Sequence, residues 1–151
     1  MFEIVEIQSL TGGVIGMGPQ PNSAAEFEIL ANYGADHLIT LTEAHEWQVD
    51  EFENYARNVC PNWHHHPVRD FTAANAAINP LVDTLTNALR SKAKIFIHCR
   101  GGCGRTGMLA MRLLILQGED PDEAMKRLRA VRPCAIEKKS QEFWARFGLN
   151  A

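Results

Sequence analysis

The chain has 151 residues, of which 46% are hydrophobic and 22% charged, as in an ordinary globular protein that buries one core. Its formal net charge of -3 argues against general nucleic-acid binding and against a polybasic membrane surface. No apolar run approaches the roughly 18 residues of a membrane-spanning helix, and the acidic start, Met1 to Glu6, is not a signal peptide. We therefore expect a single domain over residues 1–151, a monomer in the cytoplasm, with no nucleic-acid partner and no membrane partner.

The four cysteines bear on the compartment as well. Cys60, Cys99, Cys103 and Cys134 could pair, but a chain without a secretion signal belongs in a reducing compartment. We therefore expect free thiols.

The first half of the chain predicts alternating strands and helices. Loose alternation followed by a glycine-rich stretch indicates an early strand or hairpin within residues 2–19. Ser23 and Glu26 form a capping box that starts a helix. Residues 37–41 predict a buried strand, and parallel pairing is expected because a helix supplies the crossover. Asp50 is expected to cap the helix that follows.

Three consecutive histidines, His64 to His66, suggest a metal site. Neighbouring side chains on a strand point to opposite faces, so the three cannot converge on one ion. His64 and His66 share a face, yet no further ligand stands nearby at a suitable spacing. We therefore expect a strand with one solvated face, and no metal.

The second half predicts further helices around one central strand, residues 95–97. Asn79 with Pro80 and Asp120 with Pro121 are helix starts. The last helix is expected near residues 140–147. On the helix after Asp120, cations either attract an anionic substrate or, in our preferred interpretation, form a solvated face: Lys126, Arg127, Arg129 and Arg132.

The ten residues His98–Gly107 lie between the apolar runs 95–97 and 108–116, which predicts a strand, a glycine-rich turn and a buried helix. Such a turn points backbone N–H groups inward, and the helix N-terminus adds partial positive charge. That environment favours a thiolate at Cys99. The planar Arg105 guanidinium can hold two phosphate oxygens. The stretch therefore predicts a phosphate-cleaving site, the alternative being a structural turn around a buried cysteine.

Cys99 to Arg105 matches the Cys-x5-Arg motif of the cysteine-dependent protein tyrosine phosphatases, with the usual His98 before it and Thr106 after it. With its flanking strand and helix, the chain resembles the small dual-specificity branch, in particular the kinase-associated-phosphatase-like group. The resemblance implies an α/β fold with a central, mostly parallel sheet of four to five strands flanked by helices. It also implies a phosphorylated protein as substrate and an enzyme without a cofactor.

The resemblance and the chemistry together imply a two-step mechanism. Cys99 attacks phosphorus to give a cysteinyl-phosphate, which water then hydrolyses. Asp70, in a loop after a predicted strand, protonates the leaving group and later acts as base, unless it merely caps a helix after Phe71. His98 is expected to hold the loop, and Thr106 to donate to the thiolate. The phosphate oxygens are expected to meet the Arg105 side chain and the amides of Arg100, Gly101, Gly102, Cys103, Gly104 and Arg105.

The sequence leaves two possible roles open for each of two residues. Gln141 either positions the hydrolytic water, as the resemblance implies, or is an exposed helical glutamine. Cys103 either forms a reversible disulfide with oxidised Cys99 or, in our preferred interpretation, fills space as a small apolar residue.

The predicted activity is hydrolysis of phosphotyrosine, with phosphoserine and phosphothreonine as further substrates. A phosphoinositide or another polyanionic ester is the alternative among phosphatases, although only Arg100 adds charge to the loop. Sulfur or arsenate chemistry would leave Asp70 and Thr106 without a purpose. A non-catalytic phosphoprotein-binding module would normally lack the nucleophile or the arginine, and both are present.

Overall fold

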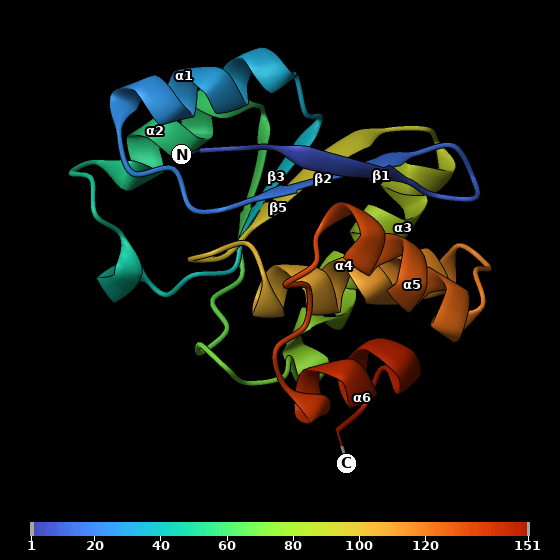
Figure 1. Cartoon of the computed structure of the whole chain (residues 1–151). Coiled ribbons are helices and arrows are strands. Elements are labelled where there is room, and N and C mark those ends of the chain that lie inside the picture. Colours follow the sequence, from blue (N-terminus) through green and yellow to red (C-terminus); the bar gives the residue numbers. More distant parts are fainter. Residues whose placement is uncertain (1, 151) are drawn as a thin grey trace.

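A five-stranded sheet runs through the computed structural model, which describes residues 2–150, and helices cover both of its faces (Figure 1). Met1 and Ala151 of the predicted domain lie outside the described residues. The strand order is β1-β2-β5-β3-β4. β1 and β2 form an antiparallel hairpin, and the other neighbouring pairs are parallel. This confirms the expected α/β class. The strands are β1 (Val5–Gln8), β2 (Val14–Gly18), β3 (His37–Thr40), β4 (Asn62–His65) and β5 (Lys94–His98).

Two apolar clusters, one on each face, hold the helices to the sheet. The smaller cluster is aromatic and lies under α1 and α2; Phe27, Phe52 and Phe96 are buried in it. The larger cluster is mostly aliphatic and joins the opposite face to the remaining four helices. The helices are α1 (Ala24–Tyr33), α2 (Phe52–Val59), α3 (Asn79–Arg90), α4 (Gly104–Leu116), α5 (Pro121–Val131) and α6 (Lys139–Phe147).

Capping residues in the sequence predicted correctly where most helices begin. The Ser23 hydroxyl accepts a hydrogen bond from the N–H of Glu26, and the Asp120 carboxylate caps α5. The expectation for Asp50 is wrong: α2 begins at Phe52, and no side chain caps it. At α3 the cap lies earlier than expected, because a 3-10 turn capped by Asn75 runs directly into the helix.

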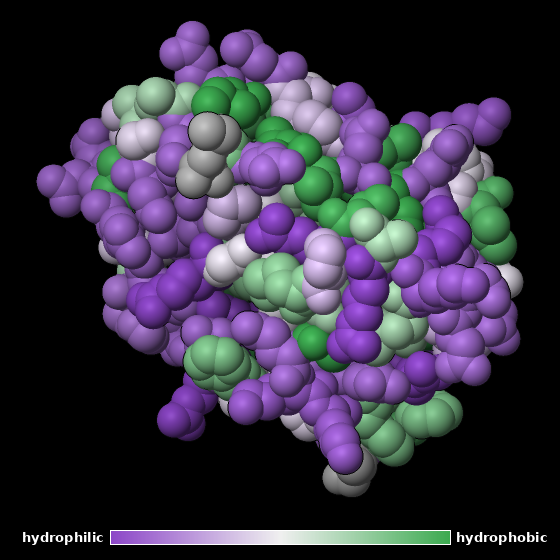
Figure 2. All heavy atoms as spheres, viewed as in Figure 1, coloured by the Kyte–Doolittle hydropathy of each residue, from purple (hydrophilic) through white to green (hydrophobic). Residues whose placement is uncertain are grey.

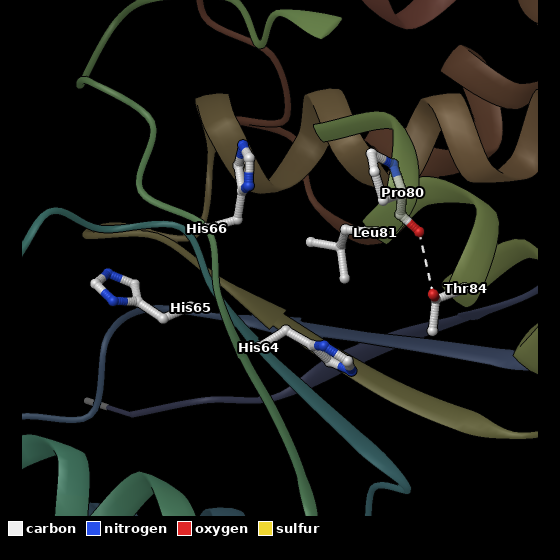
Figure 3. A pocket seen from close by; sticks show the side chains of 6 residues that line it. All are labelled: His64, His65, His66, Pro80, Leu81 and Thr84. Carbon is white, nitrogen blue, oxygen red and sulfur yellow. Dashed lines mark hydrogen bonds between the residues drawn. The ribbon is translucent and has the colours of Figure 1, made fainter. Parts of the chain in front are cut away.

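The three histidines sit on and just after β4 and do not converge (Figure 3). His64 stacks on His37, with 2.9 Å between Nδ1 of His37 and Nε2 of His64. His65 points to the other side, where its Nε2 lies 2.8 Å from the carbonyl oxygen of Thr42. His64 and His66 border an open depression beside the start of α3.

The outer surface in the view of Figure 2 is mainly hydrophilic, and apolar side chains form a band across its upper part with smaller groups elsewhere. Within residues 2–150, no helix is both long enough and apolar enough to span a membrane.

Candidate active site

The phosphate loop, which we define as residues 99–105, connects the end of β5 to the start of α4, in the helix-start geometry predicted from its glycines. Gly102 has a φ of 73°, and a Cβ at this position would collide with the carbonyl group of Gly18 at the end of β2. Only glycine fits there. The loop is thus held against the carboxyl edge of the parallel strands, where the nucleophile emerges.

Cys99 lies at the floor of a cavity of about 190 Å³. Its side chain is buried, and its Sγ accepts a hydrogen bond of 3.1 Å from the Thr106 hydroxyl. This contact is the one expected for stabilising a thiolate. The cavity is lined by Asp70, Phe71, Cys99, Arg100, Gly101, Cys103, Gly104, Arg105 and Glu137.

His98 is fully buried behind the loop and does not line the cavity. Its Nε2 lies 2.7 Å from the hydroxyl of Thr40, which accepts a hydrogen bond from Trp63 Nε1 and so can donate its own proton to the imidazole. Nδ1–H then donates to the carbonyl of Cys99 at 3.2 Å. Burial, followed by the nearby charge of Arg105, lowers the pKa of His98 to about 4. A neutral imidazole therefore links the strand to the loop.

Arg105 is buried, and a carboxylate that the sequence reasoning missed holds it in place. The two oxygens of Glu46 accept from its Nη1 and Nη2, both at 2.8 Å, and Nη1 also donates to the carbonyl of Val68. Burial acts to lower the pKa of Arg105, but the charges of Glu46, Cys99 and Asp70 outweigh it and raise the pKa. Arg105 Nε is buried and has no partner among the described residues. This guanidinium is fixed on one edge and retains a free donor for an oxyanion.

Glu46 lies in the short 3-10 turn Ala44–Glu46 after β3. Burial acts to raise its pKa, and the hydrogen bonds and charge of Arg105 reverse that effect, so its pKa is lowered. The sequence did hold a signal for Glu46, because it is an acidic residue shortly after a predicted parallel strand. The carboxyl ends of such strands meet at one edge of the sheet, where sites form.

Asp70 stands on the loop of residues 66–75, which we call the acid loop after the role predicted for Asp70. Its Oδ1 lies 3.3 Å from Nη2 of Arg105 and accepts from the N–H of Phe71, while about a third of the side chain stays exposed. No helix begins directly after Phe71, so Asp70 does not cap one; the next helical turn is capped by Asn75. The structure therefore brings Asp70 to the cavity that holds Cys99 and Arg105.

Gln141 is fully buried rather than exposed. Its Oε1 accepts from the backbone N–H groups of Glu137 and Lys138, and its Nε2 donates to the carbonyl of Thr72 at 3.3 Å. The side chain does not line the cavity, whereas Glu137 does. Glu137 is a second residue that the sequence analysis missed.

Both expectations for Cys103 are wrong, because it forms a disulfide with Cys134, with a Cα–Cα distance of 5.2 Å. The expectation of four free thiols fails for the same reason; Cys60 and Cys99 are free. The bridge joins the phosphate loop to the segment after α5. Sequence alone could not reveal it, because the spacing of four cysteines leaves their pairing open.

Two of the α5-region cations also hold this part of the molecule, although Arg129 stays exposed and Arg132 is half-buried. Arg132 donates to the carbonyls of Gly101 and Gly102, and Arg129 donates to the carbonyls of Ala135 and Ile136. Their guanidinium groups satisfy backbone oxygens that the turns leave without partners.

Solved phosphatases share this architecture. The crystal structure of kinase-associated phosphatase, with its catalytic cysteine replaced by serine, superposes with a TM-score of 0.83 at 22% identity, covering 95% of this chain and 92% of that one. The fold is therefore that of the cysteine-dependent phosphatases. The family model described as "Swiss Army Knife protein, DSP-PTPase phosphatase domain" matches residues 6–145. The chain belongs to this family, PTP-SAK.

Curated relatives align over shorter stretches. Cyclin-dependent kinase inhibitor 3 of Homo sapiens is 36% identical over 72 residues, which cover 46% of this chain and 34% of that protein. Putative tyrosine phosphatase 067L of Invertebrate iridescent virus 3 is 29% identical over 117 residues, which cover 65% of this chain and 47% of that protein. The chain thus spans between a third and a half of the length of these relatives.

Proposed function

We propose that this domain hydrolyses phosphate monoesters on proteins, phosphotyrosine first and phosphoserine or phosphothreonine second, through a phosphocysteine intermediate. The observation that carries the proposal is the free, buried Nε of Arg105 in a guanidinium that lines the same cavity as Cys99. A buried donor without a partner is costly unless a ligand fills the position. A phosphate above Cys99 supplies that partner.

In the first step the Cys99 thiolate attacks phosphorus in line. Arg105 and the loop amides balance the charge on the equatorial oxygens. Asp70 donates its proton to the leaving oxygen as the P–O bond breaks. In the second step water attacks the phosphocysteine, and the P–S electron pair returns to Cys99, where the Thr106 hydroxyl contacts the sulfur.

The mouth of the cavity favours a protein substrate over a polyanionic lipid. The Phe71 ring is 54% exposed beside Asp70 and offers a contact surface for an aromatic ester. Arg100 is the one further cation in the described cavity lining, and its Nε lies 3.7 Å from Glu46, while Glu137 adds negative charge. A phosphoinositide with several phosphates would meet little compensating charge there.

The remaining alternatives, sulfur or arsenate chemistry and a phosphoprotein-binding module, stay weaker for a geometric reason. Neither requires a carboxylate 3.3 Å from the arginine together with a hydroxyl on the nucleophile. The cytoplasmic location, the monomeric state and the absence of membrane and nucleic-acid partners remain predictions from composition. The disulfide is a feature more typical of oxidising compartments, which makes the state of Cys103 in the cell a direct check on the location.

Turnover of para-nitrophenyl phosphate and of matched phosphotyrosine and phosphothreonine peptides tests the proposal. Cys99→Ser is expected to lose activity by about 10⁴-fold or more. Asp70→Asn is expected to lose about 10²- to 10⁴-fold on the peptides and less on para-nitrophenyl phosphate, whose leaving group needs little protonation. Asp83→Asn, on the exposed side of α3, is the matched control. A folded, reduced wild-type protein without turnover would contradict the proposal.

A further inference from the structure

An acidic side chain stands at the cavity that binds the phosphate. Glu137 lines the same cavity as Cys99, and its Oε1 lies over Gly104, where a Cβ would collide with it. Gly104 begins α4, and the partial positive charge of a helix N-terminus favours an anion at this end. A carboxylate in this place repels a phosphate dianion. Its presence therefore requires an explanation other than substrate affinity.

The backbone that carries Glu137 is held from several directions. Gln141 accepts from the N–H of Glu137 at 2.9 Å, and the N–H of Ile136 donates to the carbonyl of Cys103 at 3.2 Å. Arg129 binds the two carbonyls just before Glu137. The Cys103–Cys134 disulfide ties the same segment to the phosphate loop. An exposed acidic residue with so fixed a backbone has the support that a positioned reactive group needs.

Gln141, for which water positioning was one of two alternatives, has its amide atoms beside Gly104 but uses them in hydrogen bonds to backbone groups. Its amide oxygen accepts two backbone N–H groups and its amide nitrogen donates to Thr72, and the side chain is fully buried outside the cavity lining. Its contacts fix the Glu137 backbone relative to the acid loop. Glu137 is thus the side chain from this segment that reaches the described cavity.

We propose that Glu137 is a catalytic residue of the second step: its carboxylate accepts a hydrogen bond from the water that hydrolyses the phosphocysteine. Asp70, left as a carboxylate by the first step, accepts the other proton of that water. An O–P bond forms, the P–S bond breaks, the electron pair returns to Cys99 Sγ, the transferred proton stays on Asp70, and inorganic phosphate leaves. This inference rests on the proposed function, since it concerns the hydrolysis of its intermediate.

The proposal predicts a separation of two kinetic constants. kcat/KM reports the steps up to the departure of the first product, in which Glu137 takes no part. kcat includes hydrolysis of the intermediate. Removal of the Glu137 carboxylate is therefore expected to lower kcat, whereas kcat/KM should not fall, because the loss of a charge that repels the phosphate acts to raise it.

The experiment is rapid mixing of wild type, Glu137→Ala and Glu137→Gln with para-nitrophenyl phosphate. For Glu137→Ala we expect kcat to fall by about tenfold to a hundredfold, a burst of nitrophenolate equal to the enzyme, and phosphorylated Cys99 in acid-quenched samples by mass spectrometry. Glu137→Gln retains an acceptor oxygen, so its kcat should lie between the values of wild type and Glu137→Ala. Glu142→Ala, on α6 just after this segment and paired with Arg146 outside the cavity lining, is the control and should match wild type.

Two outcomes overturn the inference. One is an unchanged kcat in Glu137→Ala, and the other is a parallel fall of kcat and kcat/KM without a burst. Wild type without any turnover would instead overturn the proposed function, so the two failures are distinguishable.

Discussion

The two sides of the cavity are built differently. The segment that we call the braced wall, residues 132–141, is held by a disulfide, by the guanidinium groups of Arg129 and Arg132 and by the buried amide of Gln141. At the tip of the acid loop, Asp70 contacts Arg105 at 3.3 Å and accepts from the N–H of Phe71. The Asp70 side chain is partly exposed, and Phe71 is largely exposed. The first side is fixed by many contacts, whereas the tip of the second is held by few.

This difference fits the roles that we propose for the two sides. A group that orients water gains from being held in one place before the reaction. A general acid must instead meet leaving groups of varied shape and change its protonation state twice in each cycle. Few contacts at a loop tip allow such movement. The contrast implies that substitutions on the braced wall and at its anchors change stability, whereas those at the tip of the acid loop change it little.

The largest effect is expected at Glu46, which anchors the arginine between both sides. Glu46→Ala leaves a buried guanidinium without its carboxylate, and removal of one partner of a buried ion pair destabilises by about 3–5 kcal/mol. Urea unfolding monitored by tryptophan fluorescence measures the loss. Glu28→Ala, on the exposed side of α1, is the control with little expected change. A loss below about 1 kcal/mol would show that Arg105 does not depend on this anchor.

The disulfide comes next, and it tests the brace directly. Cys103 and Cys134 are 31 residues apart, and closing a loop of that length stabilises by about 3–4 kcal/mol in the chain-entropy model. Cys134→Ser should therefore unfold more easily than wild type without reductant, and equally easily with it. Two titratable thiols at these positions in the oxidised wild-type protein would show that the brace relies on hydrogen bonds alone.

Glu46 and the Cys103–Cys134 disulfide are two contacts that the sequence did not predict. Strands, most helix starts and the phosphate loop were predictable, because Ser23, Asp120 and the loop glycines act on their immediate neighbours. The pairing of Glu46 with Arg105 spans 59 residues, and no local pattern marks either partner for the other. The Asp50 expectation failed because a backbone turn with Glu51 at a φ of 60° replaced the side-chain cap.

A third prediction concerns His98, the support beneath the loop. Its pKa is about 4 when folded and about 6.5 when unfolded, so the unfolded chain takes up the proton first as the pH falls. His98 should lower the free energy of unfolding by about 3 kcal/mol between about pH 6.5 and pH 4, and its contribution should level off below that window. Glu46, whose pKa is lowered, then adds a further decline at lower pH. Urea unfolding across this range measures it.

The control for that prediction is the loss of the titrating group. His98→Gln should show a shallower decline than wild type over the same pH range, and His45→Gln, exposed near Glu43, should show the wild-type slope. Parallel slopes for wild type and His98→Gln would mean that His98 is not held neutral.

The smallest effect on stability is expected at Phe71, at the tip of the acid loop. Its φ of 62° is strained for a bulky residue by about 1–2 kcal/mol, while its ring gains about 0.5–1 kcal/mol from the Lys138 ammonium 5.4 Å away. Phe71→Gly removes both terms and adds backbone freedom to the unfolded chain, so the unfolding free energy should stay within about 1 kcal/mol of wild type. KM for aryl phosphates should rise as the aromatic contact is lost. Lys92→Gly, with a φ of 65° far from the cavity, relieves similar strain and should leave KM unchanged. A loss above about 2 kcal/mol in Phe71→Gly would place the acid loop among the braced parts of the site, because an exposed ring that makes so few contacts cannot supply that much.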